Sequence, residues 1–166
     1  MLRARSADVD LSASQLTLYD PKGARQQARE HVIPLTTAAK GILERRLGEI
    51  DSVGDVEIDE SDKGPPLFTT DGKTPMRLET ISALVASISL AMVREKEARV
   101  AFQLRDLRRT AETMLASLGA SRDIRSQVQS HGLGGVQQRH YDRHEYSNEK
   151  RATLELWASH LERLVA

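Results

Sequence analysis

The most informative part of this chain runs from Leu104 to Tyr146 and reads LRDLRRTAETMLASLGASRDIRSQVQSHGLGGVQQRHYDRHEY. Its first part predicts a helix from about Leu104, because apolar residues recur at helical spacing, and Gly119 takes the glycine position at the helix end. The residues expected to face inward are Leu107, Ala111, Met114 or Leu115, and Leu118. Ser121 can cap a second, short helix that buries Ile124 and Val128.

The same stretch contains a set of candidate site residues. Arg105 and Arg108 are three residues apart, so they share one face of the predicted helix. His131 precedes a glycine-rich turn, and Tyr141 follows that turn. Guanidinium groups suit phosphate oxygens, and a tyrosine hydroxyl can serve as a covalent nucleophile. The combination indicates phosphoryl transfer that needs no metal.

These motifs resemble the carboxy-terminal catalytic motifs of the tyrosine recombinases, the phage-integrase family. That family has a His-x-x-Arg box, a turn containing histidine, and a nucleophilic tyrosine about ten residues later. Here the box is Arg105–Arg108, His131 occupies the turn, and Tyr141 stands at the nucleophile position. The resemblance extends to residues 2–10 and 20–23, and so covers most of the chain.

The resemblance implies site-specific recombination or integration of DNA, as in phages and mobile elements, through a 3′-phosphotyrosyl intermediate. Arg108 would clamp the phosphate, His131 would hydrogen-bond it, and Tyr141 would form the covalent bond. Lys22, at the tip of a β-hairpin, would act as general acid for the leaving 5′-hydroxyl. The implied partners are double-stranded DNA and other copies of the chain, as a tetramer on DNA. No cofactor and no metal are implied.

Two departures from the family pattern bear on activity. Arg105 replaces the usual histidine of the box, and arginine keeps the charge but cannot transfer a proton. The family's first catalytic arginine lies upstream of the segment at which this chain begins. We therefore expect a partial catalytic domain that has little activity alone. The alternatives are a non-catalytic DNA-binding or assembly module derived from a recombinase, and a plain helical interaction domain.

Each candidate residue also has an ordinary structural interpretation. Arg105, Arg108 and Arg109 could form a solvated helix face that pairs with Asp106 and Glu112. His131 could instead be a helix C-terminal cap, where its charge would complement the helix dipole.

The second half of the stretch offers two further alternatives. Tyr146 competes with Tyr141 as nucleophile, but the ten-residue offset from His131 favours Tyr141. His140 and His144 flank Tyr141, yet no third ligand follows at a fixed spacing, which argues against zinc.

Composition limits the class of protein. With 166 residues, 39% of them hydrophobic and 29% charged, the chain matches a globular domain with a substantial core. It has no cysteine, no secretory signal and no apolar run of membrane-spanning length, which predicts a cytoplasmic protein without membrane contact. The net charge is zero, but every charged residue from Glu49 to Asp62 is acidic, so the remainder of the chain is basic.

The first 35 residues predict a β-hairpin. Residues 15–19 and 30–35 read as its two strands, with a turn at 21–23 that carries Lys22. Residues 36–166 predict a helical region that contains the catalytic motifs. The expected fold is mostly α with a small antiparallel β-sheet near the N-terminus, an α+β class similar to the recombinase catalytic domain.

Three more helices are expected in that region. Thr36 or Thr37 would cap the first, which runs to about Leu47 and faces inward through Ile42, Leu43, Leu47 and Ile50. Leu67 and Phe68 form an apolar anchor before a turn at Asp71. Thr74 and Pro75 would start the second helix, with an inward stripe of Leu78, Ile81, Val85, Ile88 and Met92. Ser147 would cap the last, with a stripe of Leu154, Trp157, Leu161 and Leu164 that docks in cis or in trans.

Overall fold

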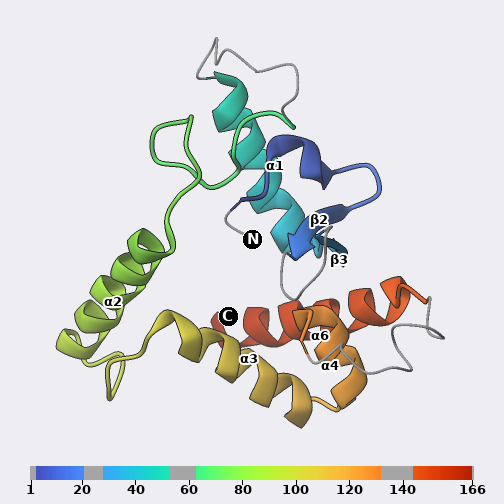
Figure 1. Ribbon diagram of the computed structural model, residues 1–166. Coiled ribbons are helices and arrows are strands. Elements are labelled where there is room, and N and C mark those ends of the chain that lie inside the picture. The colour runs from blue at the N-terminus through green and yellow to red at the C-terminus, as the bar shows by residue number, and fades with distance from the viewer. Residues whose placement is uncertain (1–2, 21–27, 53–62, 132–143, 166) are drawn as a thin grey trace.

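The computed structural model describes residues 3–20, 28–52, 63–131 and 144–165, and Figure 1 shows how their helices and strands are arranged. A 3-10 turn η1 (Ser6–Asp8) leads into the strands β1 (Val9–Asp10), β2 (Gln15–Asp20) and β3 (Arg29–Pro34). The helices are α1 (Thr37–Ser52), α2 (Leu78–Arg94), α3 (Leu104–Ser117), α4 (Arg122–Gln129) and α6 (Ser147–Val165). The prediction of a mostly helical chain with a small antiparallel sheet is confirmed.

The sheet is antiparallel, with strand order β1-β2-β3. Leu16 pairs with Ile33 and Leu18 pairs with His31, so the predicted hairpin is confirmed with strand ends within one residue of those expected. β1 was not expected, because its two residues are too few to show alternation. Figure 1 shows the sheet beside α1, while α3, α4 and α6 form a second group that lies against the sheet.

The main apolar core joins the sheet to α1 and to the segment after Lys63. Its buried members are Ala4, Leu16, Leu35, Leu43 and Leu67. Leu67 has no exposed surface, which confirms the predicted apolar anchor. The backbone N–H of Leu67 donates to the carbonyl of Ala4 at 2.9 Å, so residues 63–67 run beside the N-terminal segment. The core is therefore closed by a backbone pairing as well as by side chains.

Helix α1 follows the prediction at its start but not on its whole inner face. The N–H of Ala39 donates to the Thr36 hydroxyl at 3.3 Å, so Thr36 is the cap. The helix continues beyond Leu47 to Ser52. Leu47 packs on the core as expected, but Ile42 is 59% exposed and that prediction is wrong. The sheet covers the face of Leu43, and Ile42, one residue earlier on the helix, lies outside it.

The predicted start of α2 is also wrong. The helix begins at Leu78 with Arg77 in the N-cap position, three residues beyond Pro75. Asp71 prevents the earlier start, because its carboxylate accepts from the Thr74 hydroxyl at 2.6 Å and from the Thr74 N–H at 2.8 Å. These bonds fix a turn in which the Thr74 side chain is not available to cap a helix, and they hold the pKa of Asp71 well below its usual range.

The inward stripe expected on α2 is only partly right. Leu78 and Ile88 are 57% and 55% exposed, whereas Ser89 is fully covered. The main neighbour of α2 is α3, and Figure 1 shows α2 projecting away from the sheet. Where the chain returns toward α3, the N–H of Phe102 donates to the Ser89 hydroxyl at 2.6 Å. Among the described residues, α3 and the segment before it cover only part of α2, so much of the apolar surface of this helix stays exposed.

The α3–α4 hairpin follows the sequence closely at its ends. Gly119 has a φ of +90°, and the N–H groups of Gly119 and Ala120 donate to carbonyls in the last turn of α3. This is the glycine-terminated helix end that was predicted. The hydroxyl of Ser121 accepts from the N–H of Ile124 at 3.3 Å, which confirms the cap of α4. Leu107, however, is 51% exposed, and only Leu115 in α3 is fully buried.

Helix α6 begins at Ser147 itself, one residue before the start expected with Ser147 as its cap, and its buried residues are Lys150 and Thr153. Of the predicted stripe, Leu161 and Leu164 are 42% and 69% exposed, so the described residues do not bury this end of it in cis. The neighbours of α6 are β3, α4 and α3, which cover mainly the first half of the helix. Within the part of the chain described here, no helix is long and apolar enough to span a bilayer.

We expect Leu67→Ala to lower the free energy of unfolding by about 2–5 kcal/mol, because it leaves a cavity in a site with no exposed surface. Leu164→Ala is the matched control, since its side chain is 69% exposed, and it should change stability by less than about 0.5 kcal/mol. Urea denaturation of both variants measures the difference. Equal stabilities would contradict the assignment of Leu67 to the core.

Candidate functional site

The α3–α4 hairpin determines where the candidate arginines lie. Because the chain reverses at Gly119, the first turns of α3 lie beside the last turn of α4. Arg108, in the second turn of α3, contacts Gln129, the last residue of α4. The motif arginine and the residues just before His131 are thereby brought together, although twenty residues separate them in the sequence.

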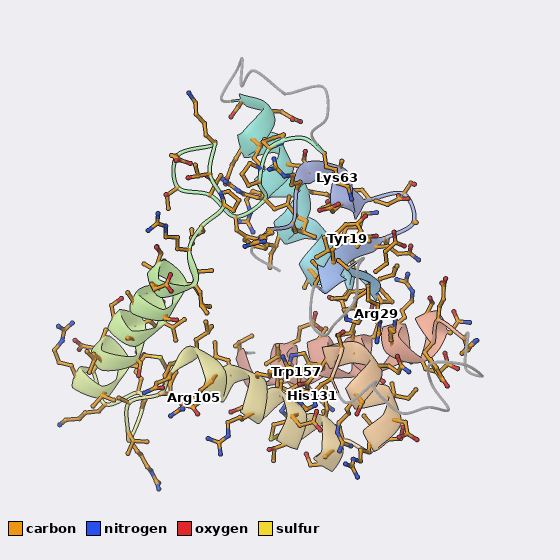
Figure 2. All side chains as sticks on the ribbon, in the orientation of Figure 1. Tyr19, Arg29, Lys63, Arg105, His131 and Trp157 are labelled. Atoms are coloured by element: carbon orange, nitrogen blue, oxygen red, sulfur yellow. The ribbon has the colours of Figure 1, made fainter. Side chains whose placement is uncertain are left out.

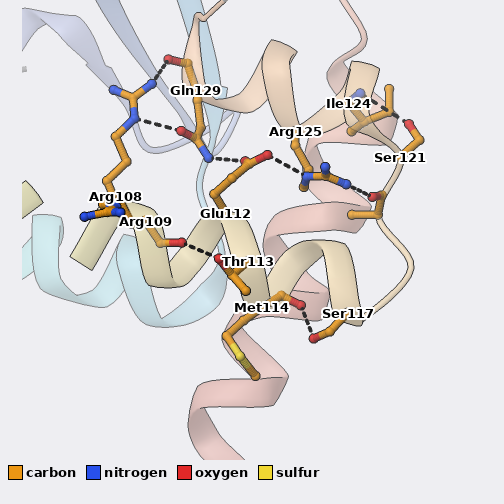
Figure 3. Close-up of polar contacts among 11 residues, drawn as sticks. Arg108, Arg109, Glu112, Thr113, Met114, Ser117, Ser121, Ile124, Arg125 and Gln129 are labelled. Atoms are coloured by element: carbon orange, nitrogen blue, oxygen red, sulfur yellow. Dashed lines mark hydrogen bonds and ion pairs between the residues drawn. The ribbon is translucent and has the colours of Figure 1, made fainter. Parts of the chain in front are cut away.

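Arg108 is held by two hydrogen bonds to a single residue (Figure 3). Its Nε donates to Oε1 of Gln129 at 2.7 Å, and its Nη2 donates to the backbone carbonyl of Gln129 at 3.0 Å. A guanidinium has five N–H donors, so three remain for other acceptors. The side chain is exposed to solvent and oriented at the same time.

Glu112 supports this arrangement from the next turn of α3. Its Oε2 accepts from Nε2 of Gln129 at 2.5 Å, and its Oε1 accepts from Nε of Arg125 at 2.8 Å. Arg125 also donates through Nη1 to the carbonyl of Ala120. The result is a continuous polar chain from Arg108 through Gln129 and Glu112 to Arg125, drawn as dashed lines in Figure 3.

The interpretation of the arginines as a solvated helix face applies to Arg109. Arg109 pairs with Asp106 at 3.5 Å, and 77% of its side chain is exposed. Exposed pairs of this kind contribute little to stability. Glu112, in contrast, pairs with Arg125 of α4, so it joins two helices and does not neutralise the arginines of the motif.

His131 follows directly after α4. Its backbone N–H donates to the carbonyl of Ser126 at 3.0 Å, and Ser130 before it has a left-handed φ of 50°. The C-cap residue is Ser130, and His131 follows it with an exposed side chain. Figure 2 shows His131 at this end of the hairpin.

Arg105 lies one turn before Arg108 and is also exposed. Figure 2 shows it on the first turn of α3, at the end that faces α2. The other two predicted site residues, Lys22 and Tyr141, lie outside the described residues, as do the glycine turn and His140. The structure thus brings together Arg108 and the segment of His131, with Arg105 on the neighbouring turn.

The sequence analysis missed the supporting residues Gln129 and Arg125, and it assigned Glu112 to the wrong partners. The spacing of four residues between Arg108 and Glu112 indicated a shared face. No sequence signal identified Gln129, because its role depends on which residue of α4 meets Arg108 when the two helices pack.

A second polar contact fixes the end of α4 to the sheet. Nε2 of His31 in β3 lies 3.0 Å from the carbonyl of Val128, so it is the ring nitrogen that carries hydrogen. His31 is buried. The carbonyls of Val128 and Gln129 therefore receive donors from β3 and from α3.

Lys150 of α6 makes a further polar contact with the sheet. It is 5% exposed, and its Nζ donates to the carbonyl of Val32 on the outer edge of β3 at 3.0 Å. Burial lowers the pKa of Lys150, and the nearby charge of Arg29 lowers it further, while Glu145 acts in the opposite direction. The next residue, Arg151, donates to the carbonyl of Leu35 at 3.3 Å. Two cations thus attach α6 to the sheet through backbone carbonyls.

Comparisons with known proteins give no match among family models, curated proteins or solved structures.

Lys150 should make the stability of the wild type depend on pH. Because its pKa is lower in the folded than in the unfolded state, the unfolded state binds more protons between the folded pKa and 10.5. The wild type should therefore gain stability relative to Lys150→Met as the pH rises through that interval. Urea denaturation of both proteins at a series of pH values measures the difference, and a constant difference would contradict the prediction.

Proposed function

We propose that this chain is the catalytic part of a site-specific DNA recombinase or integrase, which cleaves and rejoins duplex DNA through a 3′-phosphotyrosyl intermediate. The observation that supports this most is the position of Arg108. Its guanidinium is exposed and is oriented by Gln129, which precedes His131 by two residues in the sequence. An exposed, oriented arginine is suited to bind the non-bridging oxygens of a phosphodiester.

In the proposed reaction the Tyr141 hydroxyl attacks phosphorus. A bond forms between the tyrosine oxygen and phosphorus, the bond from phosphorus to the 5′-oxygen breaks, and the tyrosine proton passes to solvent water. Lys22 supplies a proton to the departing 5′-oxygen. Arg108 and His131 stabilise the negative charge that builds on the non-bridging oxygens. Attack of a 5′-hydroxyl on the phosphotyrosine reverses these steps, so rejoining needs no ATP.

The proposed partners follow from the reaction. Exchange of strands between two duplexes needs four cleavage events, and four copies of the chain on DNA would supply one tyrosine each. The C-terminal end of α6 is the part of this helix that contacts with the other described residues bury least, and it exposes Leu161 and Leu164.

A second candidate function is a non-catalytic DNA-binding or assembly module derived from a recombinase. Arg105 favours it, because a guanidinium keeps its proton at every physiological pH and cannot replace a histidine that transfers one. Phosphate binding would persist in such a module, since Arg105 and Arg108 both carry positive charge on the exposed side of α3.

DNA binding by this chain should weaken steeply with salt. We expect Arg108→Ala to reduce the slope of log affinity against log salt concentration by about 0.9, the value for one lost phosphate contact on duplex DNA. Arg45→Ala on α1 is the control, because it removes the same exposed charge from a helix outside the α3–α4 hairpin. Fluorescence anisotropy with a duplex oligonucleotide gives both slopes. A wild-type affinity that does not change with salt would refute DNA binding.

Tyr141→Phe separates the two candidate functions. The protein for this test is the product of the full open reading frame that contains the chain, and the DNA is a nicked duplex from the flanks of that gene. For a recombinase we expect a covalent protein–DNA adduct on denaturing gels that Tyr141→Phe abolishes, while DNA binding persists. Tyr146→Phe should retain the adduct. Binding without any adduct would favour the non-catalytic module.

A further inference from the structure

Gln129 stands between two charged groups of opposite sign. Its amide nitrogen donates to Glu112 at 2.5 Å, and its amide oxygen accepts from Arg108 at 2.7 Å. We propose that Gln129 is a positioning residue, which orients Arg108 toward phosphate while separating it from the Glu112 carboxylate. This inference rests on the proposed function, because it concerns how the chain binds DNA phosphates.

The carboxylate determines which way the amide points. An ionised carboxylate only accepts hydrogen bonds, so the NH2 group of Gln129 must face Glu112 and its oxygen must face away. That oxygen is then directed at Nε of Arg108. Glu112 itself is fixed because its other oxygen accepts from Arg125 at 2.8 Å. The orientation of Arg108 is thus set from Arg125 of α4 through two intervening side chains.

The neutral amide also preserves the charge of Arg108. A carboxylate in contact with the guanidinium would neutralise it and reduce its attraction for a phosphate. In this structure the carboxylate of Glu112 pairs with Arg125, whose side chain is only 15% exposed. The charge of the exposed Arg108 is therefore not neutralised, and the counter-charge goes to the partly buried Arg125.

The geometry leaves one edge of the guanidinium for a ligand. Gln129 takes Nε and Nη2, which form one edge of the planar group. Among the described residues, Gln129 is the hydrogen-bond partner of Arg108, so the edge formed by Nη1 and Nη2 remains for two phosphate oxygens. Gln129 therefore determines which edge Arg108 presents.

An exchange of the two residues tests this proposal. The double variant Glu112→Gln with Gln129→Glu keeps the net charge and the hydrogen-bond pattern. The new glutamine at 112 can accept from Arg125 and donate to position 129, and the carboxylate at 129 can accept from Arg108. The one change is that the carboxylate moves from the partly buried Arg125 to the exposed Arg108.

We expect the exchange variant to lower the salt slope of duplex DNA binding by about 0.9, as Arg108→Ala does. Circular dichroism and urea denaturation check that the exchange variant is folded.

Gln129→Met provides a second test that needs no new charge. It removes the amide but keeps a side chain of similar length, and should weaken DNA binding about fivefold when Arg108 is present. The same substitution in an Arg108→Ala background should leave affinity unchanged.

The outcomes distinguish this inference from the proposed function. Suppose that the wild type binds DNA in a salt-dependent way and that the exchange and Gln129→Met variants have the same affinity and slope as the wild type. This result overturns the inference but not the proposed function. A wild type whose binding does not depend on salt overturns the proposed function, and the inference with it. If the exchange variant does not fold, the inference is tested by Gln129→Met in the wild-type and Arg108→Ala backgrounds.

Discussion

The hydrogen bonds to the last carbonyls of α4 connect this helix to the sheet and to α3. His31 of β3 lies 3.0 Å from the carbonyl of Val128, and Arg108 of α3 donates to that of Gln129 at 3.0 Å. The last carbonyls of a helix have no partner within it, so they must find donors elsewhere. Here those donors come from the sheet and from the neighbouring helix. Contacts with β3 and α3 therefore fix the position of the end of α4, and with it the start of the segment that contains His131.

Two kinds of contact stabilise the two halves of the fold. The half that contains the sheet and α1 is closed by apolar side chains around Leu67, which is fully buried. The helical half is joined to it largely by polar groups, among them His31, Lys150 and Arg151, which bind backbone carbonyls. Buried polar groups require specific partners, whereas apolar side chains require only shape and area. These polar contacts therefore specify the positions of α4 and α6 against β3 more sharply than packing alone would.

Helices α2 and α6 show why apolar periodicity does not by itself identify a buried face. Both helices exist where the pattern placed them, apart from the later start of α2 at Leu78. Their fully buried residues are nevertheless polar, Ser89 in α2 and Lys150 with Thr153 in α6. Which side of a helix is covered depends on its neighbours, and a helix against a sheet edge buries groups that can bind that edge. Periodicity reports which side is apolar, and packing decides which side is covered.

The sequence alone determined most of the elements and several of their ends, because these depend on local chemistry. Ser121 caps α4, Gly119 ends α3, and the alternation of residues 15–19 gives a strand, each through interactions within a few residues. It also placed Arg108 on an exposed helix face. Only the tertiary structure decided that Arg108 meets Gln129, and that Glu112 pairs with Arg125 across the hairpin. Those contacts depend on how two helices align, and no local preference encodes that alignment.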